Sequence, residues 1–137
     1  MSISQHFNFI DKADAFGAVD SIPQLSFTLI RKNNFVEVLG LLDTGASVNV
    51  LPYNIGLQLG ASWEQQTTSV MLAGNLAPIE AKGLILTAQI GEFIPVRLVF
   101  AWCQSNEVPL LLGRMNFLKE FDVCFYTSNK IFELSKK

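Results

Sequence analysis

The chain has 137 residues, of which half are hydrophobic and only 16% are charged, and its net charge is −2. This length suits a single domain, and the lack of a basic cluster argues against nucleic-acid binding. The apolar runs are too short for a membrane-spanning helix, and Asp11 and Asp14 interrupt any signal-peptide core. We therefore expect a cytoplasmic protein that binds neither nucleic acid nor membrane.

Residues 1–22 are the least regular part of the chain, because acidic and small residues interrupt apolar ones such as Phe7 and Phe16. This pattern indicates either a surface strand or arm, or a pro-segment that the protein itself removes. The residues do not decide between these two readings. Pro23 begins the main domain, which we expect to span residues 23–137.

The main domain is predicted to be all-β, with short strands separated by turns. In its first hairpin, alternating apolar residues precede a turn at residues 32–34, and the return strand ends at Asp43. The expected strands span residues 24–31, 35–42, 63–72, 84–90, 93–102, 121–126 and 130–134, with helical spacing at residues 54–60 and 114–121. This arrangement predicts a small closed antiparallel β-barrel with one short C-terminal helix.

The most informative stretch is Asp43-Thr44-Gly45, which follows the apolar strand directly. A carboxylate at the end of a core strand is costly to bury unless hydrogen bonds surround it. The following backbone N–H groups can supply such bonds, and Gly45 allows a tight turn. On its own the tripeptide also fits an ordinary β-turn with Asp in the first position.

A second motif strengthens the signal, because Leu110-Leu111-Leu112-Gly113-Arg114 precedes the C-terminal helical pattern. Together the two motifs resemble those of the retropepsin-like aspartic proteases of the single-domain, cellular or bacterial type. The resemblance covers about residues 24–134. It implies an acid-protease β-barrel in which Asp43, Thr44 and Gly45 form the catalytic motif. Gly113 and Arg114 would have a structural role, opening a helix behind it.

The resemblance also implies a homodimer. Aspartic-protease chemistry needs two carboxylates that share a proton, and this chain has a single Asp-Thr-Gly unit. A two-fold axis would bring Asp43 of two identical chains together to hydrolyse a peptide or an unfolded protein. Thr44 would then hydrogen-bond across the axis, and the Gly45 region would hold the substrate backbone.

Ala46 bears on the pH dependence of this activity. The two-domain pepsins usually have Ser at this position, and its hydroxyl can stabilise the ionised carboxylate pair. Because Ala46 lacks that donor, we expect a mildly acidic activity optimum rather than a strongly acidic one.

Residues 70–79 are the candidate flap, with two short β arms around Ala73-Gly74-Asn75. Gly74 would give its tip mobility. The local sequence alone favours an ordinary exposed hairpin, and the position about thirty residues after Asp43 favours the flap. The apolar side chains among the candidate substrate-binding residues indicate that the substrate has apolar side chains beside the cleaved bond. Each of these residues also suits plain core packing. The expected substrate-binding residues are Ala46, Ser47, Leu72, Ala73, Gly74, Asn75, Leu76, Pro109 and Leu111.

Two positions depart from the retroviral pattern. Ser47 replaces an Asp that usually pairs with the helix Arg, and Met115 replaces an Asp or Asn. Arg114 must therefore find another partner. These changes leave open an alternative function, a dimeric peptide-binding module with the same fold and no cleavage. An intact Asp43-Thr44-Gly45 motif argues against it, since binding alone needs no costly carboxylate pair.

Other chemistries have little support. The chain has one histidine, His6, so neither Ser–His catalysis nor a histidine-based metal site is expected. No phosphate-binding loop is present, and we expect no cofactor and no metal. Cys103 and Cys124 are too few for a disulfide framework and are expected to be reduced and buried.

Overall fold

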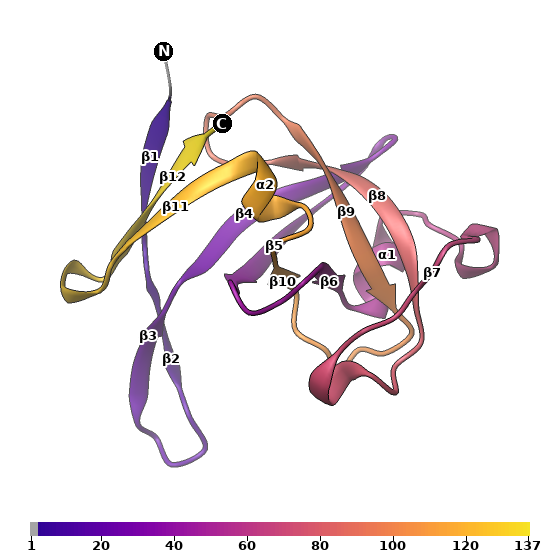
Figure 1. The fold of residues 1–137 in the computed structure, drawn as a ribbon, viewed down its shortest axis with the longest axis horizontal. Helices are drawn as coiled ribbons and strands as arrows, with labels where there is room; N and C mark the ends of the chain where they lie inside the picture. Colours follow the sequence, from indigo (N-terminus) through magenta and orange to yellow (C-terminus); the bar gives the residue numbers. More distant parts are fainter. Residues whose placement is uncertain (1–2) are drawn as a thin grey trace.

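The computed structural model describes residues 3–137, which form short strands and a few helical turns (Figure 1). The strands are β1 (Ser4–Asn8), β2 (Ile10–Ala13), β3 (Val19–Ile22), β4 (Gln24–Arg31), β5 (Asn34–Leu42), β6 (Asn49–Leu51), β7 (Ser69–Val70), β8 (Ala81–Gln89), β9 (Val96–Cys103), β10 (Leu111–Leu112), β11 (Phe121–Tyr126) and β12 (Ile131–Lys136). The helices are α1 (Tyr53–Gln58) and α2 (Phe117–Glu120), and the 3-10 turns are η1 (Trp63–Gln65), η2 (Gly74–Leu76) and η3 (Thr127–Asn129).

Six strands close into a barrel in the order β4-β5-β10-β6-β9-β8, with β8 pairing back onto β4. The all-β closed barrel predicted from the sequence is therefore confirmed. Most neighbours are antiparallel, but β10 pairs with β5 in parallel and β6 pairs with β9 in parallel. β10 inserts between β5 and β6, which brings the two sequence motifs side by side.

The β4–β5 hairpin delivers Asp43 from a buried strand end. The predicted strands over residues 24–31 and 35–42 pair in a register that runs from Gln24 opposite Leu41 to Arg31 opposite Asn34. The tight turn between them uses a positive φ of 55° at Lys32.

Two apolar clusters fill the barrel. The larger one contains Trp102, which is fully buried and stacks on Tyr53 with ring centroids 5.5 Å apart. The smaller cluster lies beneath the loop that follows β5 and includes Val50, Leu72 and Leu111. It also contains Cys103, whose pKa burial raises to about 11, so its thiol stays protonated.

The chain ends form a separate three-stranded sheet in the order β1-β12-β11. Phe7 of β1 stacks on Phe132 of β12, with ring centroids 5.5 Å apart. In the sequence, strands β2 and β3 lie between β1 and β4. They form a hairpin that pairs with no other strand of residues 3–137. Figure 1 shows this hairpin projecting away from the body of the molecule.

Asn49 is the buried polar side chain that joins the two motifs. Its Oδ1 accepts the N–H of Gly113 at 2.8 Å, and its Nδ2 donates to the carbonyl of Val99 at 3.0 Å. A buried amide is stable there because these bonds replace its bonds to water. Asn49 therefore holds the end of β10 against β6 and β9.

Several local predictions were wrong. Residues 63–72 form η1, a loop and the short β7, because Trp63 packs into the core from a turn. The helix expected over residues 114–121 is limited to the short α2, in which Phe117 is buried, and Met115 before it is half-exposed. Cys124 is exposed on β11. No helix in residues 3–137 has the length and apolar character to cross a membrane.

A glycine substitution tests how tightly the two motifs pack. A Cβ at Gly113 would lie 2.5 Å from the carbonyl oxygen of Val48 and 2.7 Å from that of Ala46. Backbone atoms cannot move aside cheaply, so Gly113→Ala should lower the free energy of unfolding by about 3 kcal/mol.

Gly83→Ala is the matched control, because its nearest neighbour would be 3.7 Å away. It should change the free energy of unfolding by less than about 1 kcal/mol in urea titrations. Equal losses in the two variants would contradict the close packing behind the Asp43 loop.

Candidate active site

The Asp43 loop, residues 43–48, connects β5 to β6. The half-buried Asp43 carboxylate accepts the N–H of Gly45 through Oδ1 at 2.9 Å. Its backbone carbonyl accepts the N–H of Ala46 at 3.1 Å, so the turn closes on itself. The carboxylate is therefore oriented by the backbone of its own loop and keeps its second oxygen open.

The second motif supports this loop from behind. The N–H of Asp43 donates to the carbonyl of Leu112 at 3.0 Å, and the N–H of Arg114 donates to that of Ala46 at 2.9 Å. Met115 continues the contact with a 3.0 Å bond from its N–H to the carbonyl of Ser47. The loop is thus held at Asp43, Ala46 and Ser47 by backbone hydrogen bonds to residues 112–115.

Arg114 takes a backbone partner where the retroviral pattern would offer a carboxylate. Its Nη1 donates to the carbonyl of Thr44 at 2.9 Å. No acidic side chain of residues 3–137 lies within ion-pair distance of it. Ser47 offers no carboxylate to Arg114, but through this contact with Thr44 the guanidinium still fixes the Asp43 loop.

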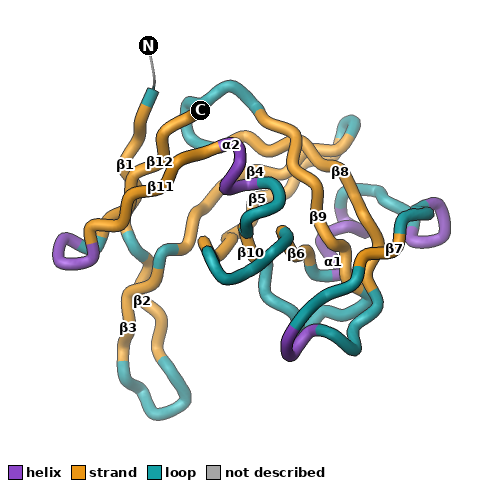
Figure 2. The backbone as a smooth tube through the Cα atoms, in the orientation of Figure 1, coloured by secondary structure: helices purple, strands orange, loops and turns teal. Residues whose placement is uncertain are grey.

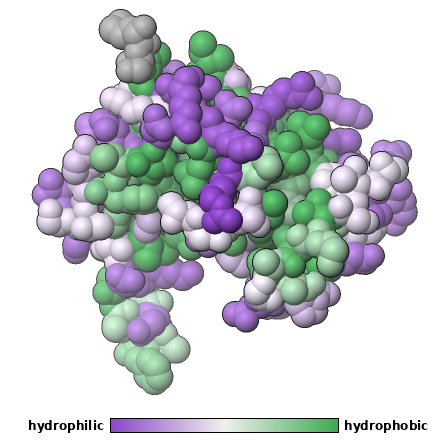
Figure 3. All heavy atoms as spheres, in the orientation of Figure 1, coloured by the Kyte–Doolittle hydropathy of each residue, from purple (hydrophilic) through white to green (hydrophobic). Residues whose placement is uncertain are grey.

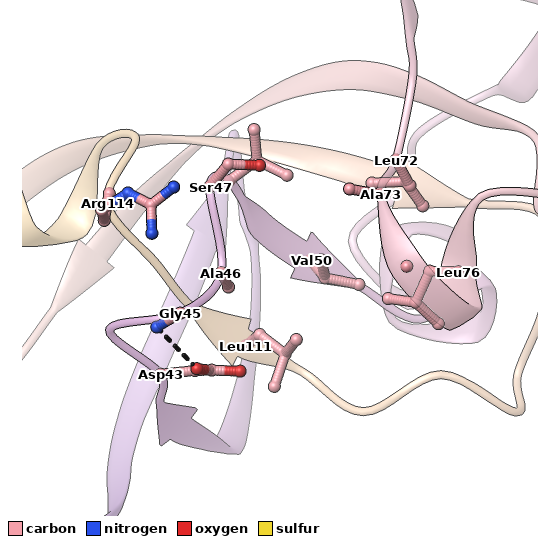
Figure 4. A pocket seen from close by; sticks show the side chains of 12 residues that line it. Asp43, Gly45, Ala46, Ser47, Val50, Leu72, Ala73, Leu76, Leu111 and Arg114 are labelled. Atoms are coloured by element: carbon pink, nitrogen blue, oxygen red, sulfur yellow. Dashed lines mark hydrogen bonds between the residues drawn. The ribbon is translucent and has the colours of Figure 1, made fainter.

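An open cleft of about 410 Å³ lies over the loop, and Figure 4 shows its lining. Val50 and Leu111 lie between Asp43 and the pair formed by Leu72 and Leu76. The cleft therefore has a carboxylate at one end and apolar walls beyond it. The lining residues are Asp43, Gly45, Ala46, Ser47, Val48, Val50, Leu72, Ala73, Gly74, Leu76, Leu111 and Arg114.

Four expected site residues do not line the cleft. Asn75 and Pro109 are exposed beside it, and Gly113 is buried behind the Asp43 loop. Thr44 is exposed, and its hydroxyl has no hydrogen-bond partner among the described residues. Its side chain is therefore available to a group outside this chain.

Sequence reasoning missed Val48 and Val50 as lining residues. Both follow the Asp-Thr-Gly motif at alternate positions, and Val50 is buried in β6. That alternation was a usable signal, since residues two apart on a strand share one face.

The candidate flap differs from the expected hairpin. β7 pairs with β8 through Ser69 opposite Lys82 and Val70 opposite Ala81, so the two arms lie outside residues 71–80. The expected return strand at residues 76–79 is wrong, because η2 and a turn occupy this stretch. Figure 2 shows it as a long loop with one helical turn. Gly74 has a φ of 63°, which its lack of a Cβ permits.

The site contains one carboxylate, Asp43, and one cation, Arg114. No group of three or more metal-ligating side chains occurs within residues 3–137. A single carboxylate can accept a proton from water but has no second acid beside it to protonate a leaving group. The cleft within one chain therefore supplies at most one member of a general acid–base pair.

The fold is similar to that of a solved protein. The crystal structure of a retropepsin-like aspartic protease from Rickettsia conorii matches with a TM-score of 0.62, covering 99% of this chain and 94% of that chain. The two sequences are 17% identical. No protein-family model and no curated protein matches the sequence. The structural similarity shows that the chain has a retropepsin-like fold.

Proposed function

We propose that this protein is an aspartic endopeptidase that acts as a homodimer, with one Asp43 from each chain. The observation that carries the proposal is the Asp43 carboxylate, oriented by Gly45 at 2.9 Å and placed at the end of an apolar cleft. The similarity in fold to a retropepsin-like aspartic protease supports it.

The reaction follows from two carboxylates that share one proton. The ionised Asp43 removes a proton from water as the water oxygen attacks the peptide carbonyl carbon, while the protonated Asp43 of the second chain donates to the carbonyl oxygen. The first Asp43 then passes the proton that it took from water to the amide nitrogen, while the second Asp43 takes a proton back from a hydroxyl of the tetrahedral intermediate. The C–N bond breaks, a carboxylic acid and an amine leave, and the pair again holds one shared proton.

The exposed surface of the Asp43 loop suits a two-fold contact. Thr44 offers a free hydroxyl, and Arg114 holds the Thr44 carbonyl at 2.9 Å and so fixes the backbone at that point. In the homodimer the Thr44 hydroxyl donates across the axis to the partner loop. An isologous interface of this kind brings identical loops together across the axis.

The substrate is a peptide or an unfolded protein with apolar side chains beside the cleaved bond. Leu72 and Leu76 reach the cleft from residues 71–80, and Leu111 forms its floor next to Asp43. Burial of an apolar substrate side chain against these residues contributes roughly 1.5–3 kcal/mol. The segment 71–80 is the flap that covers the bound peptide.

Substitution of the proposed catalytic group is the direct test. Asp43→Asn keeps the size of the side chain but removes the base, so cleavage of an apolar peptide library should fall by about 10²-fold or more. Asp122→Asn is the matched control, because among residues 3–137 this exposed carboxylate pairs only with Lys137, at 3.4 Å on the surface.

The control should cleave as the wild type does. Equal cleavage by Asp43→Asn and wild type would remove Asp43 from the mechanism. Peptide binding without cleavage by either protein would favour the binding module instead.

Ala46, the residue after Gly45, should determine the lower end of the pH range in which the protein is active. Wild-type cleavage should peak at mildly acidic pH, because Ala46 offers no hydroxyl to the ionised carboxylate pair. Ala46→Ser adds that donor, which stabilises the ionised form and moves the acid limb of the pH–rate profile to lower pH. Identical acid limbs, or a wild-type maximum near about pH 2, would contradict this account.

A further inference from the structure

We propose that the β2–β3 hairpin clasps a second copy of this chain beside the Asp43 loop. This inference rests on the proposed homodimer and identifies a surface that would stabilise it. The occupant is therefore a second identical chain, not an unrelated protein.

The root of the hairpin lies next to Asp43. The carbonyl of Pro23, directly after β3, accepts the N–H of Leu42 at 3.1 Å, and Gln24 lies opposite Leu41. In Figure 1 the hairpin projects toward the same side of the molecule as the Asp43 loop and η2, away from the two termini. Any chain that contacts the Asp43 loop thus meets the base of this hairpin.

The hairpin has little support from its own chain. Residues 11–20 are all exposed, and its two strands pair only with each other within the described part of the chain. An isolated two-stranded hairpin is marginally stable in water. A surface that packs on it would supply the missing stabilisation.

Its tip is preorganised and apolar. Asp14 Oδ1 accepts the N–H groups of Phe16 at 2.8 Å and Ala18 at 3.0 Å, and Gly17 adopts a φ of 80°. This turn presents Phe16 with 95% of its surface exposed, and Val19 follows at 68%. Figure 3 shows the apolar colour on this projection. A rigid aromatic side chain at the end of an ordered turn is typical of an interface anchor.

The length of the hairpin suits the proposed dimer. Phe16 lies six positions before Ile22 in the sequence, so the tip of the hairpin extends about 20 Å from its root. The two Asp43 carboxylates must approach to about 3 Å in order to share a proton. Because the root of the hairpin adjoins Leu42, a partner loop at that separation lies within the reach of the hairpin, and a two-fold axis makes the contact twice.

Sedimentation equilibrium of the full-length protein tests this surface. Phe16→Ser should raise the dimer dissociation constant about 10²-fold, because each dimer contains the contact twice. Phe35→Ser is the matched control. Phe35 is also exposed, at 73%, but it lies beside the β4–β5 turn, at the other end of β5 from Asp43.

The control should dimerise as the wild type does, and all three proteins should show the same thermal unfolding. Raising the concentration of Phe16→Ser should restore its cleavage activity per chain. Equal dissociation constants for Phe16→Ser and Phe35→Ser would overturn the inference while leaving the homodimer intact.

Two further results would count against it. A higher KM for Phe16→Ser with an unchanged dissociation constant would assign the hairpin to substrate. An intact mass showing that the wild-type dimer has lost residues 1–22 would exclude the hairpin from the interface. A wild type that stays monomeric at every concentration would instead contradict the proposed function itself.

Discussion

The pairing of the Asp43 loop with residues 110–115 is the constraint on which the rest of the structure depends. β10 lies between β5 and β6, so the backbones of Asp43, Ala46 and Ser47 hydrogen-bond to the backbone of residues 112–115. Gly113 allows this approach because a side chain there would overlap two carbonyl groups. Asn49 then closes the polar network from the barrel side. The carboxylate is therefore held on rigid backbone even though it lies on a surface loop.

The same constraint explains why the substituted positions are tolerated. Arg114 binds the Thr44 carbonyl, a backbone group that is present whatever side chain occupies position 47. Ser47 removes a carboxylate partner but leaves the loop paired through its main chain to Met115. The Asp43 loop therefore keeps its geometry although position 47 carries Ser in place of an acidic residue. The proposed catalytic residues then depend on a second chain for the other carboxylate and for a partner to the Thr44 hydroxyl.

The strands that pair locally were predictable, since β4, β5, β8, β9 and the β11–β12 hairpin follow alternating or continuous apolar patterns between turns. The position of Asp43 and the apolar lining at Leu72, Leu76 and Leu111 followed from two motifs and their resemblance. The predictions that were wrong concern residues whose positions are set by tertiary contacts. Trp63 packs in the core from a 3-10 turn, and α2 begins only at Phe117, which is buried while Met115 before it is half-exposed. Single-sequence patterns carry no information on which of two neighbouring apolar residues finds the core.

The central claim is that one functional cleft needs Asp43 from two chains, and subunit mixing tests it most directly. Wild-type protein at a fixed concentration above its dimer dissociation constant is equilibrated with increasing Asp43→Asn protein, and peptide cleavage is measured. Random pairing predicts that activity falls to about one half at equal amounts and to about one tenth at a ninefold excess of the variant. Activity that stays constant at every ratio would show that each chain works alone and would contradict the account.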